Sequence, residues 1–216
     1  MEELSIHIPL DRIELEGILT IPKGAQGLIL FAHGSGSSRH SPRNQWVAKE
    51  LQKAHLATLL VDLLTQEEEG VDRQTAHLRF DIAFLATRLL GITEWLAEES
   101  NTKYLKIGYF GASTGAAAAL QTAAHTSQDI FAIVSRGGRP DLAGALLLSK
   151  VRAPVLLIVG GEDYPVIDMN QEALKELHCE KKMVVIPGAT HLFEESGTLA
   201  EVARLASDWF RSHLSE

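Results

Sequence analysis

Short apolar runs alternate along the chain with longer segments that are apolar on one side only. Residues 5–8 and 13–21 alternate between apolar and polar positions and are separated by a turn, which predicts an antiparallel hairpin at the N-terminus. Six later runs are apolar on both faces, as expected of central strands in a parallel sheet: 28–32, 56–61, 105–110, 131–134, 155–159 and 183–186.

Helical periodicity fills the intervals between these runs, over residues 44–53, 78–97, 116–124, 166–177 and 199–213. The acidic run 67–69 is expected to be solvated. Strands that alternate with helices are typical of an α/β fold with right-handed crossovers. We therefore expect residues 1–216 to form a single α/β domain, with about eight strands in a mostly parallel sheet, helices on both faces and no large cap domain.

Composition and charge narrow the class of protein. The 216 residues include 20 Lys and Arg against 28 Asp and Glu, a formal net charge of −8, which argues against nucleic acid as a partner. Cys179 is the only cysteine, so no intrachain disulfide can form. The acidic N-terminus lacks the apolar run of a signal peptide, and no apolar stretch is long enough for a transmembrane helix. These features predict a cytoplasmic protein without a membrane partner.

The strongest chemical signal is the sequence Gly-Ala-Ser-Thr-Gly at 111–115, which follows a predicted strand and precedes an alanine-rich helix. In this context G-x-S-x-G forms a sharp turn that projects the serine hydroxyl above the sheet edge, beside the N-terminus of the helix. The alternative is a loop of small residues in which Ser113 only caps the helix. The strand–turn–helix context favours Ser113 as a nucleophile.

A serine hydroxyl needs a base that accepts its proton and an acid that orients this base. His191 follows the strand at 183–186, and Asp163 follows the strand at 155–159, so both are expected on loops at the carboxyl edge of the sheet. The resulting order of serine, aspartate and histidine along the chain is a known triad order. Glu162 and Asp168 are weaker alternatives for the acid, because Glu162 is expected to point to solvent and Asp168 to lie within a helix.

An oxyanion formed at Ser113 would need two backbone N–H donors. One is expected from Thr114, the residue after the nucleophile, and the other from the glycine-rich loop at 33–38. Within that loop Ser35 is the preferred donor and Gly36 is the alternative. His33 is interpreted as a residue that braces the loop.

These motifs resemble those of the α/β-hydrolase superfamily and, within it, of the dienelactone hydrolase-like proteins. The resemblance covers nearly the whole chain and rests on four segments: FAHGSG at 31–36, GASTG at 111–115, GGED at 160–163 and GATHLF at 188–193. It implies the α/β-hydrolase fold and hydrolysis of esters or lactones by a nucleophile–Asp–His triad, with no metal or organic cofactor. The founding dienelactone hydrolases use a cysteine nucleophile, whereas this chain has Ser113, so a general carboxylesterase is the preferred prediction.

Two arginines are candidates for substrate binding. Arg136 follows the strand at 131–134, at the same expected edge, and Arg39 ends the glycine-rich loop. Because a guanidinium pairs bidentately with a carboxylate or phosphate, either residue could select anionic substrates. The alternative is that each arginine pairs with an acid, for instance Asp62 or Asp141, and braces a loop.

The sequence thus predicts a serine hydrolase for small carboxylic esters or lactones, since the short connections leave no residues for an inserted lid. Thioester hydrolysis or acyl transfer would use the same triad and is the enzymatic alternative. A nucleotide-binding module is a rival, because residues 34–39 begin like G-x-G-x-x-G, but Arg39 stands where the third glycine is needed. A non-catalytic α/β module would leave the ordered Ser113, Asp163 and His191 unexplained.

Overall fold

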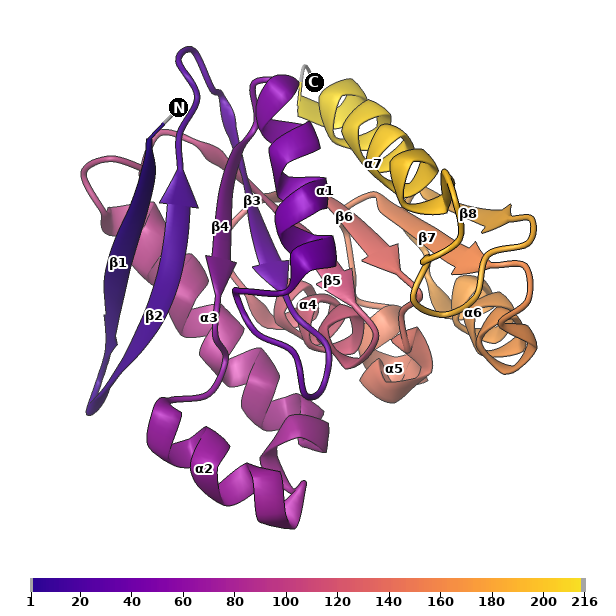
Figure 1. Cartoon of the computed structure of the whole chain (residues 1–216), viewed down its shortest axis with the longest axis horizontal. Coiled ribbons are helices and arrows are strands. Elements are labelled where there is room, and N and C mark those ends of the chain that lie inside the picture. The colour runs from indigo at the N-terminus through magenta and orange to yellow at the C-terminus, as the bar shows by residue number, and fades with distance from the viewer. Residues whose placement is uncertain (1, 215–216) are drawn as a thin grey trace.

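The computed structural model describes residues 2–214 and contains an eight-stranded sheet with helices on both faces (Figure 1). The strands are β1 (Glu3–Leu10), β2 (Ile13–Thr20), β3 (Gly27–Ala32), β4 (Ala57–Val61), β5 (Lys106–Ala112), β6 (Ile130–Arg136), β7 (Val155–Gly160) and β8 (Lys181–Ile186). Their order in the sheet is β1-β2-β4-β3-β5-β6-β7-β8. β1 and β2 form the predicted hairpin, β2 also pairs antiparallel with β4, and the other pairings are parallel.

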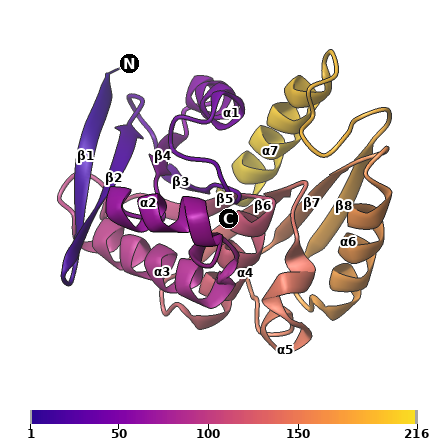
Figure 2. The same ribbon diagram turned by 60° about the horizontal axis from the view of Figure 1, so that its bottom comes forward.

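The helices form a layer on each side of the sheet. α1 (Pro42–Lys53) and α7 (Thr198–Leu214) cover one face, and α3 (Ile82–Glu98), α4 (Thr114–His125) and α6 (Tyr164–Glu176) cover the other (Figure 2). A 3-10 turn (Pro140–Ala143) and α5 (Ala145–Leu148) connect β6 to β7. None of the helices within residues 2–214 is long and apolar enough to cross a membrane.

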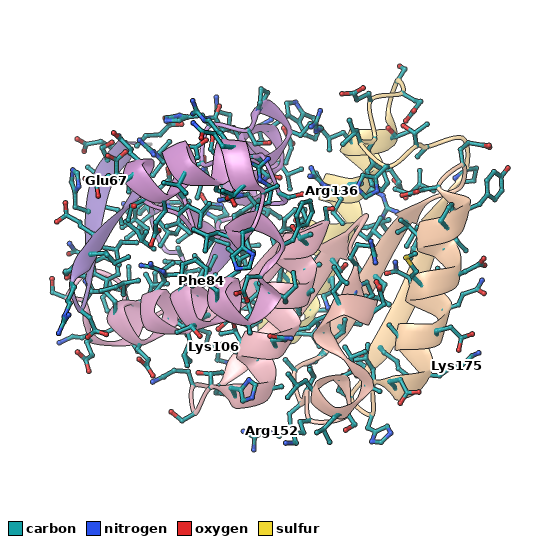
Figure 3. The ribbon with its side chains drawn as sticks, turned by 90° about the horizontal axis from the view of Figure 1, so that it is seen from below. Glu67, Phe84, Lys106, Arg136, Arg152 and Lys175 are labelled. Atoms are coloured by element: carbon teal, nitrogen blue, oxygen red, sulfur yellow. The ribbon has the colours of Figure 1, made fainter. Side chains whose placement is uncertain are left out.

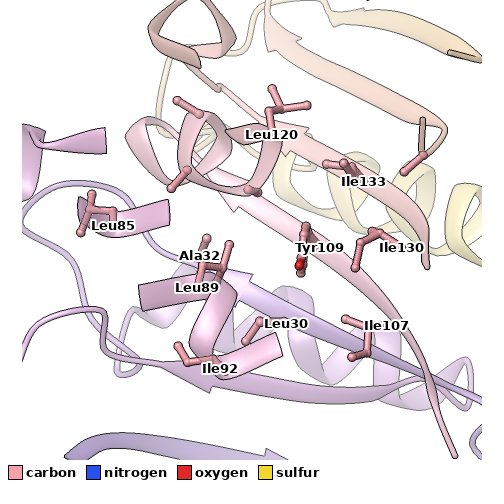
Figure 4. Packing of buried hydrophobic residues seen from close by; sticks show 14 of the residues in the cluster. Leu30, Ala32, Leu85, Leu89, Ile92, Ile107, Tyr109, Leu120, Ile130 and Ile133 are labelled. Carbon is pink, nitrogen blue, oxygen red and sulfur yellow. The ribbon is translucent and has the colours of Figure 1, made fainter. Parts of the chain in front are cut away.

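Each face of the sheet is buried in its own apolar layer. Toward α3 and α4, Leu30 and Tyr109 of the sheet pack with Leu85, Leu89 and Ile92 of α3 (Figure 4). On the face of α1 and α7, two strand phenylalanines of β3 and β5 stack with their ring centroids 4.8 Å apart. Because successive residues of a strand point to opposite faces, central strands that serve both layers must be apolar throughout.

The predicted fold class is confirmed, and each predicted strand and helix is present with its ends shifted by a few residues. The predicted helix at 78–97 is divided, however. A 3-10 turn spans Leu78–Phe80, and α3 begins after Asp81, whose Oδ1 accepts the Phe84 N–H at 3.0 Å. This side-chain cap starts a new helix where the periodicity alone indicated a continuous one.

Helix α2 (Gln66–Thr75) was not predicted, because Asp72 is its only buried residue and it therefore has no apolar stripe. A reciprocal pair of hydrogen bonds starts the helix. The Glu68 N–H donates to Thr65 Oγ1 at 3.2 Å, and the Thr65 N–H donates to Glu68 Oε2 at 2.9 Å. Glu68 also forms an ion pair with Arg88 of α3. The expectation that the acidic run 67–69 is merely solvated is therefore wrong for Glu68.

Candidate active site

Ser113 occupies a sharp turn between β5 and α4, with backbone angles of φ +50° and ψ −121°. A positive φ is uncommon for a residue with a side chain, so the surrounding structure must hold this strained conformation. The Ser113 N–H donates to the Arg136 carbonyl oxygen at 3.3 Å, and the Ser113 carbonyl oxygen accepts the Arg139 N–H at 3.0 Å. Its side chain makes no capping hydrogen bond, so Ser113 is not a side-chain cap of α4.

Glycines on either side of Ser113 make this turn possible. A Cβ atom at Gly111 would lie 2.4 Å from the Ala116 Cα, and a Cβ atom at Gly115 would lie 2.1 Å from the Ala32 carbonyl oxygen. Both distances are far below van der Waals contact, so a side chain at either position would push α4 away from the sheet. Gly111 therefore lets the start of α4 lie against β5, and Gly115 lets it lie against the end of β3, where the glycine-rich loop begins.

Asp163 follows β7, His191 follows β8, and their side chains are joined by a hydrogen bond. The distance between His191 Nδ1 and Asp163 Oδ2 is 2.7 Å, and the exposed fractions of the two side chains are 38% and 13%. An ionised carboxylate can only accept, so Nδ1 carries the donated hydrogen and Nε2 is left as the second ring nitrogen. Of the alternative acids, Glu162 is exposed and accepts from the Tyr164 hydroxyl at 3.0 Å, and Asp168 lies in α6.

The end of β6 connects the loops of Ser113 and His191. Arg136 accepts the Ser113 N–H, and the next residue lies directly against His191: a Cβ atom at Gly137 would be 3.1 Å from the His191 carbonyl oxygen and 3.5 Å from Nδ1. Ser113, Asp163 and His191 thus follow β5, β7 and β8 at the same edge of the sheet, as expected for parallel strands. Figure 3 views the molecule from the end toward which these strands run.

Thr114 and Ser35, the predicted oxyanion donors, lie beside each other. The Ser35 N–H donates to Thr114 Oγ1 at 2.9 Å. The glycine-rich loop also approaches the predicted nucleophile, because a Cβ atom at Gly34 would lie 3.1 Å from the Ser113 Cβ. The Thr114 N–H belongs to the first turn of α4, where backbone donors have no intrahelical acceptor. The structure therefore brings both predicted donors close to Ser113. One of them, the Ser35 N–H, already donates to the Thr114 hydroxyl oxygen.

His33 braces the glycine-rich loop, as predicted. Its Nε2 accepts the Leu63 N–H at 3.1 Å, so Nδ1 is the protonated nitrogen and donates to the Gly34 carbonyl oxygen at 2.9 Å. Part of the residue remains exposed, yet the ring is enclosed deeply enough for desolvation to lower the pKa of His33 from its ordinary value of 6.5. The hydrogen bond to Gly34 and the charges of Asp62 and Glu69 raise the pKa of His33, but by less than desolvation lowers it.

The lowered pKa of His33 predicts a pH-dependent loss of stability. Between pH 6.5 and the lower pKa of the folded chain, the unfolded chain binds more protons at this histidine than the folded chain does, so the free energy of unfolding should fall as the pH falls through this range. Urea unfolding at pH 7.5 and 5.5 measures this decrease, which should be smaller in His33→Gln. At pH 7.5 His33→Gln should be less stable than wild type by about 1–3 kcal/mol, because the bracing hydrogen bonds are weakened. The exposed His77→Gln is the control, and an equal decrease in all three proteins would contradict the assignment.

Arg39 is held by two carboxylates. Its guanidinium forms ion pairs with Asp62 and Glu16, and its backbone N–H donates to Asp62 Oδ1 at 2.6 Å. Glu16 lies on β2, so these contacts fasten the end of the glycine-rich loop to the sheet. They favour the loop-bracing alternative for Arg39 over substrate binding, with Asp62 in the bracing role predicted for it.

Arg136 and Arg139, three residues apart, differ in their partners. Arg139 donates to both carboxylate oxygens of Asp141, with Nε–Oδ1 and Nη2–Oδ2 distances of 2.9 and 2.8 Å. Arg136 ends β6 and is 8% exposed, and its Nε and Nη1 atoms are buried without a hydrogen-bond partner within residues 2–214. Of these two arginines of the β6 loop, Arg139 is paired, whereas Arg136 has two guanidinium nitrogens without a hydrogen-bond partner in the described residues.

A small cavity lies beside Ser35, between the glycine-rich loop and α2. Its volume is about 170 Å³, below the ~300–1,000 Å³ of pockets that hold drug-sized ligands. Leu64, Leu85 and the pair of Asp72 and Arg79 complete its walls, with Arg79 Nε 2.6 Å from Asp72 Oδ2. The part of the cavity wall that α2 forms was not expected, because the sequence pattern did not predict this helix. The Thr-x-x-Glu capping signal at residues 65–68 was the available clue.

Cys179 lies between α6 and the amino end of β8, whereas the predicted site is at the carboxyl end of that strand. Within residues 2–214, no three His, Cys, Asp or Glu side chains are grouped closely enough to hold a metal ion. Burial raises the pKa of the Cys179 thiol, so little of the reactive thiolate is present at neutral pH. The thiol of Cys179 is therefore not placed to act with His191.

Alkylation of Cys179 is expected to leave esterase turnover unchanged. The reason is its position at the opposite end of β8 from His191. The measurement compares kcat/KM before and after treatment with iodoacetamide, with incorporation followed by mass spectrometry. Cys179→Ser is the control. Loss of turnover on alkylation of the wild type, together with loss of turnover in untreated Cys179→Ser, would contradict a serine mechanism.

Several known proteins resemble this chain in sequence or in structure. The profile of the "Dienelactone hydrolase family" matches residues 15–214. The crystal structure of dienelactone hydrolase from Anabaena variabilis is 57% identical, covers 98% of each chain and has a TM-score of 0.96. Est1E from Butyrivibrio proteoclasticus shares the fold with a TM-score of 0.81 over 98% of this chain and 99% of that chain, at 18% identity.

Two Mycobacterium tuberculosis proteins named "Putative phosphoribosyl transferase" are 52% identical over 214 residues. The match includes 99% of this chain but 47% of theirs, so the chain spans about half the length of these relatives. The family profile, by contrast, extends over nearly the whole chain and agrees with the family resemblance of the sequence motifs. The chain therefore belongs to the dienelactone hydrolase family.

Proposed function

We propose that this protein is a serine hydrolase that cleaves small carboxylic esters or lactones through an acyl-enzyme at Ser113. The observation that carries the proposal is the 2.7 Å hydrogen bond between Asp163 and His191, at the sheet edge where the strained turn of Ser113 lies. A serine hydroxyl becomes an effective nucleophile when an oriented histidine accepts its proton. The family supplies the reaction class, and these three residues supply the proposed chemistry.

The orientation of His191 determines where the protons would move. Its Nδ1–H donates to Asp163, so Nε2 would take the proton of Ser113 Oγ as Oγ bonds to the ester carbonyl carbon. The resulting imidazolium, stabilised by Asp163, would return this proton to the leaving alkoxide as the C–O bond breaks. A water molecule activated in the same way would then release the acid from Ser113.

The negative oxygen formed in each step would be stabilised by backbone donors. The Thr114 N–H is available at the start of α4, and the Ser35 N–H lies beside it but donates to Thr114 Oγ1. A substrate oxygen would compete for the Ser35 N–H, and the Thr114 hydroxyl would then be free to turn its own hydrogen toward that oxygen. Removing a single such donor costs about 10²–10³ in kcat in a well-studied protease, which sets the scale for this contribution.

The cavity beside Ser35 supports a small substrate. Its volume is about 170 Å³, and it is lined by the glycine-rich loop and α2 but not by Ser113 or His191, so it would accommodate only a short group that extends from Ser113 past Ser35. Helix α2, which follows β4 at this edge, forms one wall of that cavity and offers no apolar face that could line a long acyl channel. Long fatty-acyl esters should therefore be poor substrates.

Active-site labelling and substrate comparison test the proposal directly. A fluorophosphonate probe should modify the wild-type protein, and peptide mapping should place the label on Ser113. Short p-nitrophenyl esters and small lactones should be turned over, and long-chain esters should be turned over poorly. Absence of labelling together with absence of turnover on the whole panel would contradict the proposal, and a preference for long chains would contradict the size argument alone.

Thioester hydrolysis or acyl transfer is the second candidate, because it uses the same nucleophile and base. Matched oxygen esters and thioesters of one acyl group, with and without an added alcohol acceptor, separate the three reactions. The name of the Mycobacterium tuberculosis relatives belongs to chains of about twice this length. We therefore propose hydrolase activity for this chain alone and take no activity from the name of those longer proteins.

A further inference from the structure

Asn170 is a fully buried amide in the middle of α6. It is 0% exposed, and its Nδ2 atom donates to two carbonyl oxygens, that of Val166 at 2.8 Å and that of Gly138 at 2.9 Å. Its Oδ1 atom has no hydrogen-bond partner within residues 2–214. Because both neighbours are acceptors, a hydroxyl could serve only one of them and an ionised carboxylate could serve neither. The position therefore requires the two donors of an amide NH₂ group.

The two hydrogen bonds of Asn170 have different effects. The bond to Val166 lies within α6 and fixes the orientation of the Asn170 side chain. The bond to Gly138 crosses from α6 to the loop after β6. A Cβ atom at Gly138 would lie 1.9 Å from Ser135 Oγ and 2.6 Å from the Ala116 Cβ of α4, so this loop packs closely against its neighbours. Asn170 therefore fastens a tightly packed backbone segment to α6.

The segment that Asn170 holds contains two backbone partners of Ser113. The Ser113 N–H donates to the Arg136 carbonyl oxygen at 3.3 Å, and the Arg139 N–H donates to the Ser113 carbonyl oxygen at 3.0 Å. Gly138 lies between these two partners and directly precedes Arg139. Figure 3 labels Arg136 at the carboxyl edge of the sheet, where the segment begins. A shift of the Gly138 carbonyl group would therefore move the groups that hold the strained turn.

Helix α6 also carries the proposed acid. Asp163 directly precedes the helix, and its carbonyl oxygen accepts the Val166 N–H at 3.0 Å. Asn170 follows Asp163 by seven residues, about two helical turns, so the two residues lie on the same side of the helix. One helix thus holds the acid beside His191 and, two turns further along, the segment that contacts the nucleophile's turn.

We infer that Asn170 is a positioning residue: by holding the Gly138 carbonyl group, it keeps the strained turn of Ser113 in its reactive position. The inference rests on the proposed function and adds to it a residue that acts on the nucleophile through the backbone of another segment. A strained conformation persists only where the surrounding structure holds it. The segment 136–139 holds the turn from the side of β6, and Asn170 fixes that segment relative to α6.

Removal of the Asn170 amide should lower kcat much more than it changes KM. In Asn170→Ala the Gly138 carbonyl group loses its donor and Ser113 is displaced, so kcat for a short p-nitrophenyl ester should fall about ten- to a hundredfold. KM should stay within about twofold of wild type, because the groups that bind the ester remain. Asn170→Ser should lose as much kcat, since its hydroxyl can donate to the Val166 carbonyl oxygen within the helix but is too short to reach Gly138.

Gln52→Ala is the matched control for a buried amide. Gln52 is also buried, and its Nε2 atom donates to Thr58 Oγ1 at 2.8 Å near the amino end of β4, at the opposite edge of the sheet from the site. Thermal unfolding should show a lower Tm for Gln52→Ala and for both Asn170 variants, whereas kcat should fall only in the Asn170 variants. Wild-type kcat in Asn170→Ser would reduce Asn170 to a structural brace and overturn the inference.

The pH profile of kcat/KM separates an effect on the nucleophile from an effect on the acid at the start of α6. The profile of Asn170→Ser should be lowered at every pH and keep the midpoint of wild type. The reason is that the substitution leaves the hydrogen bond between Asp163 and His191 in place. A shifted midpoint would mean that Asn170 acts through this pair of residues, and would overturn its assignment to the turn of Ser113.

A cycle of unfolding measurements distinguishes failure of this inference from failure of the proposed function, because it requires no turnover. Glycine adopts positive φ without strain, so loosening the segment 136–139 releases no strain in Ser113→Gly. Urea unfolding should therefore show a larger loss of stability from Asn170→Ala in Ser113→Gly than in wild type, and an equal loss from Gln52→Ala in both. Coupling without ester hydrolysis would support the positioning contact and contradict the proposed function alone. Additive losses would overturn the inference even if wild type hydrolyses esters.

Discussion

Replacement of Ser113 by alanine is expected to lower kcat/KM for a short p-nitrophenyl ester by a factor on the order of 10⁴ or more, with the fold retained. The variant loses the only atom that would bond to the ester carbonyl carbon, while the Asp163–His191 pair and the backbone donors remain. Steady-state kinetics measures the loss, and fluorophosphonate labelling should disappear with it. Near-native turnover by Ser113→Ala would show that Ser113 is not the nucleophile.

The strained backbone of Ser113 makes glycine an informative second substitution. Alanine keeps a Cβ atom at φ +50° and should keep the strain, whereas glycine adopts positive φ readily. Ser113→Gly should be as inactive as Ser113→Ala, yet its free energy of unfolding should equal or exceed that of wild type by up to about 2 kcal/mol. Urea unfolding of the three proteins measures this difference. A Ser113→Gly protein less stable than Ser113→Ala would mean that the turn is not strained in the way its backbone angles indicate.

Much of the site could be predicted because its residues follow strands that the apolar runs already marked. Strands that run parallel deliver the loops after them to the same edge, so Ser113, Asp163 and His191 could be placed together without knowledge of any distance. The flanking Gly111 and Gly115 could also be interpreted in advance, because a close approach of strand and helix leaves no room for a Cβ atom. These inferences depend on local sequence and on sheet topology alone.

Other features depend on partners that are far apart in the sequence. Arg39 follows β3 and forms an ion pair with Glu16 of β2. This contact depends on the antiparallel pairing of β2 with β4, which the order of the strands along the chain does not specify. Helix α2 is held by its capping box and by the ion pair of Glu68 with Arg88, so hydrophobic periodicity could not find it. The lack of hydrogen-bond partners at Nε and Nη1 of Arg136 is likewise a property of its surroundings. The sequence alone was compatible with both substrate binding and loop bracing for this residue.

The amide variant Asp163→Asn tests the proposed acid with almost no change in shape. We expect kcat/KM at neutral pH to fall by a factor on the order of 10⁴. In wild type the carboxylate accepts the hydrogen of His191 Nδ1. An asparagine NH₂ group would instead donate to Nδ1, which would move the ring hydrogen to Nε2 and remove the base that accepts the serine proton. Glu162→Gln and Asp168→Asn are matched controls, and both should retain wild-type kinetics because they lie outside this hydrogen bond.

The double variant Ser113→Ala/Asp163→Asn decides whether the two residues act as one unit. If Asp163 works only by orienting His191 toward Ser113, its replacement can cost nothing further once the serine hydroxyl is absent, so the double variant should be about as active as Ser113→Ala. Losses that instead multiply would mean that Asp163 acts on turnover by another route, for instance by holding the loop after β7. Comparison of kcat/KM among wild type, the two single variants and the double variant measures this coupling directly. Full coupling is expected because the hydrogen bond to Nδ1 leaves His191 Nε2 as the only ring nitrogen that can serve Ser113.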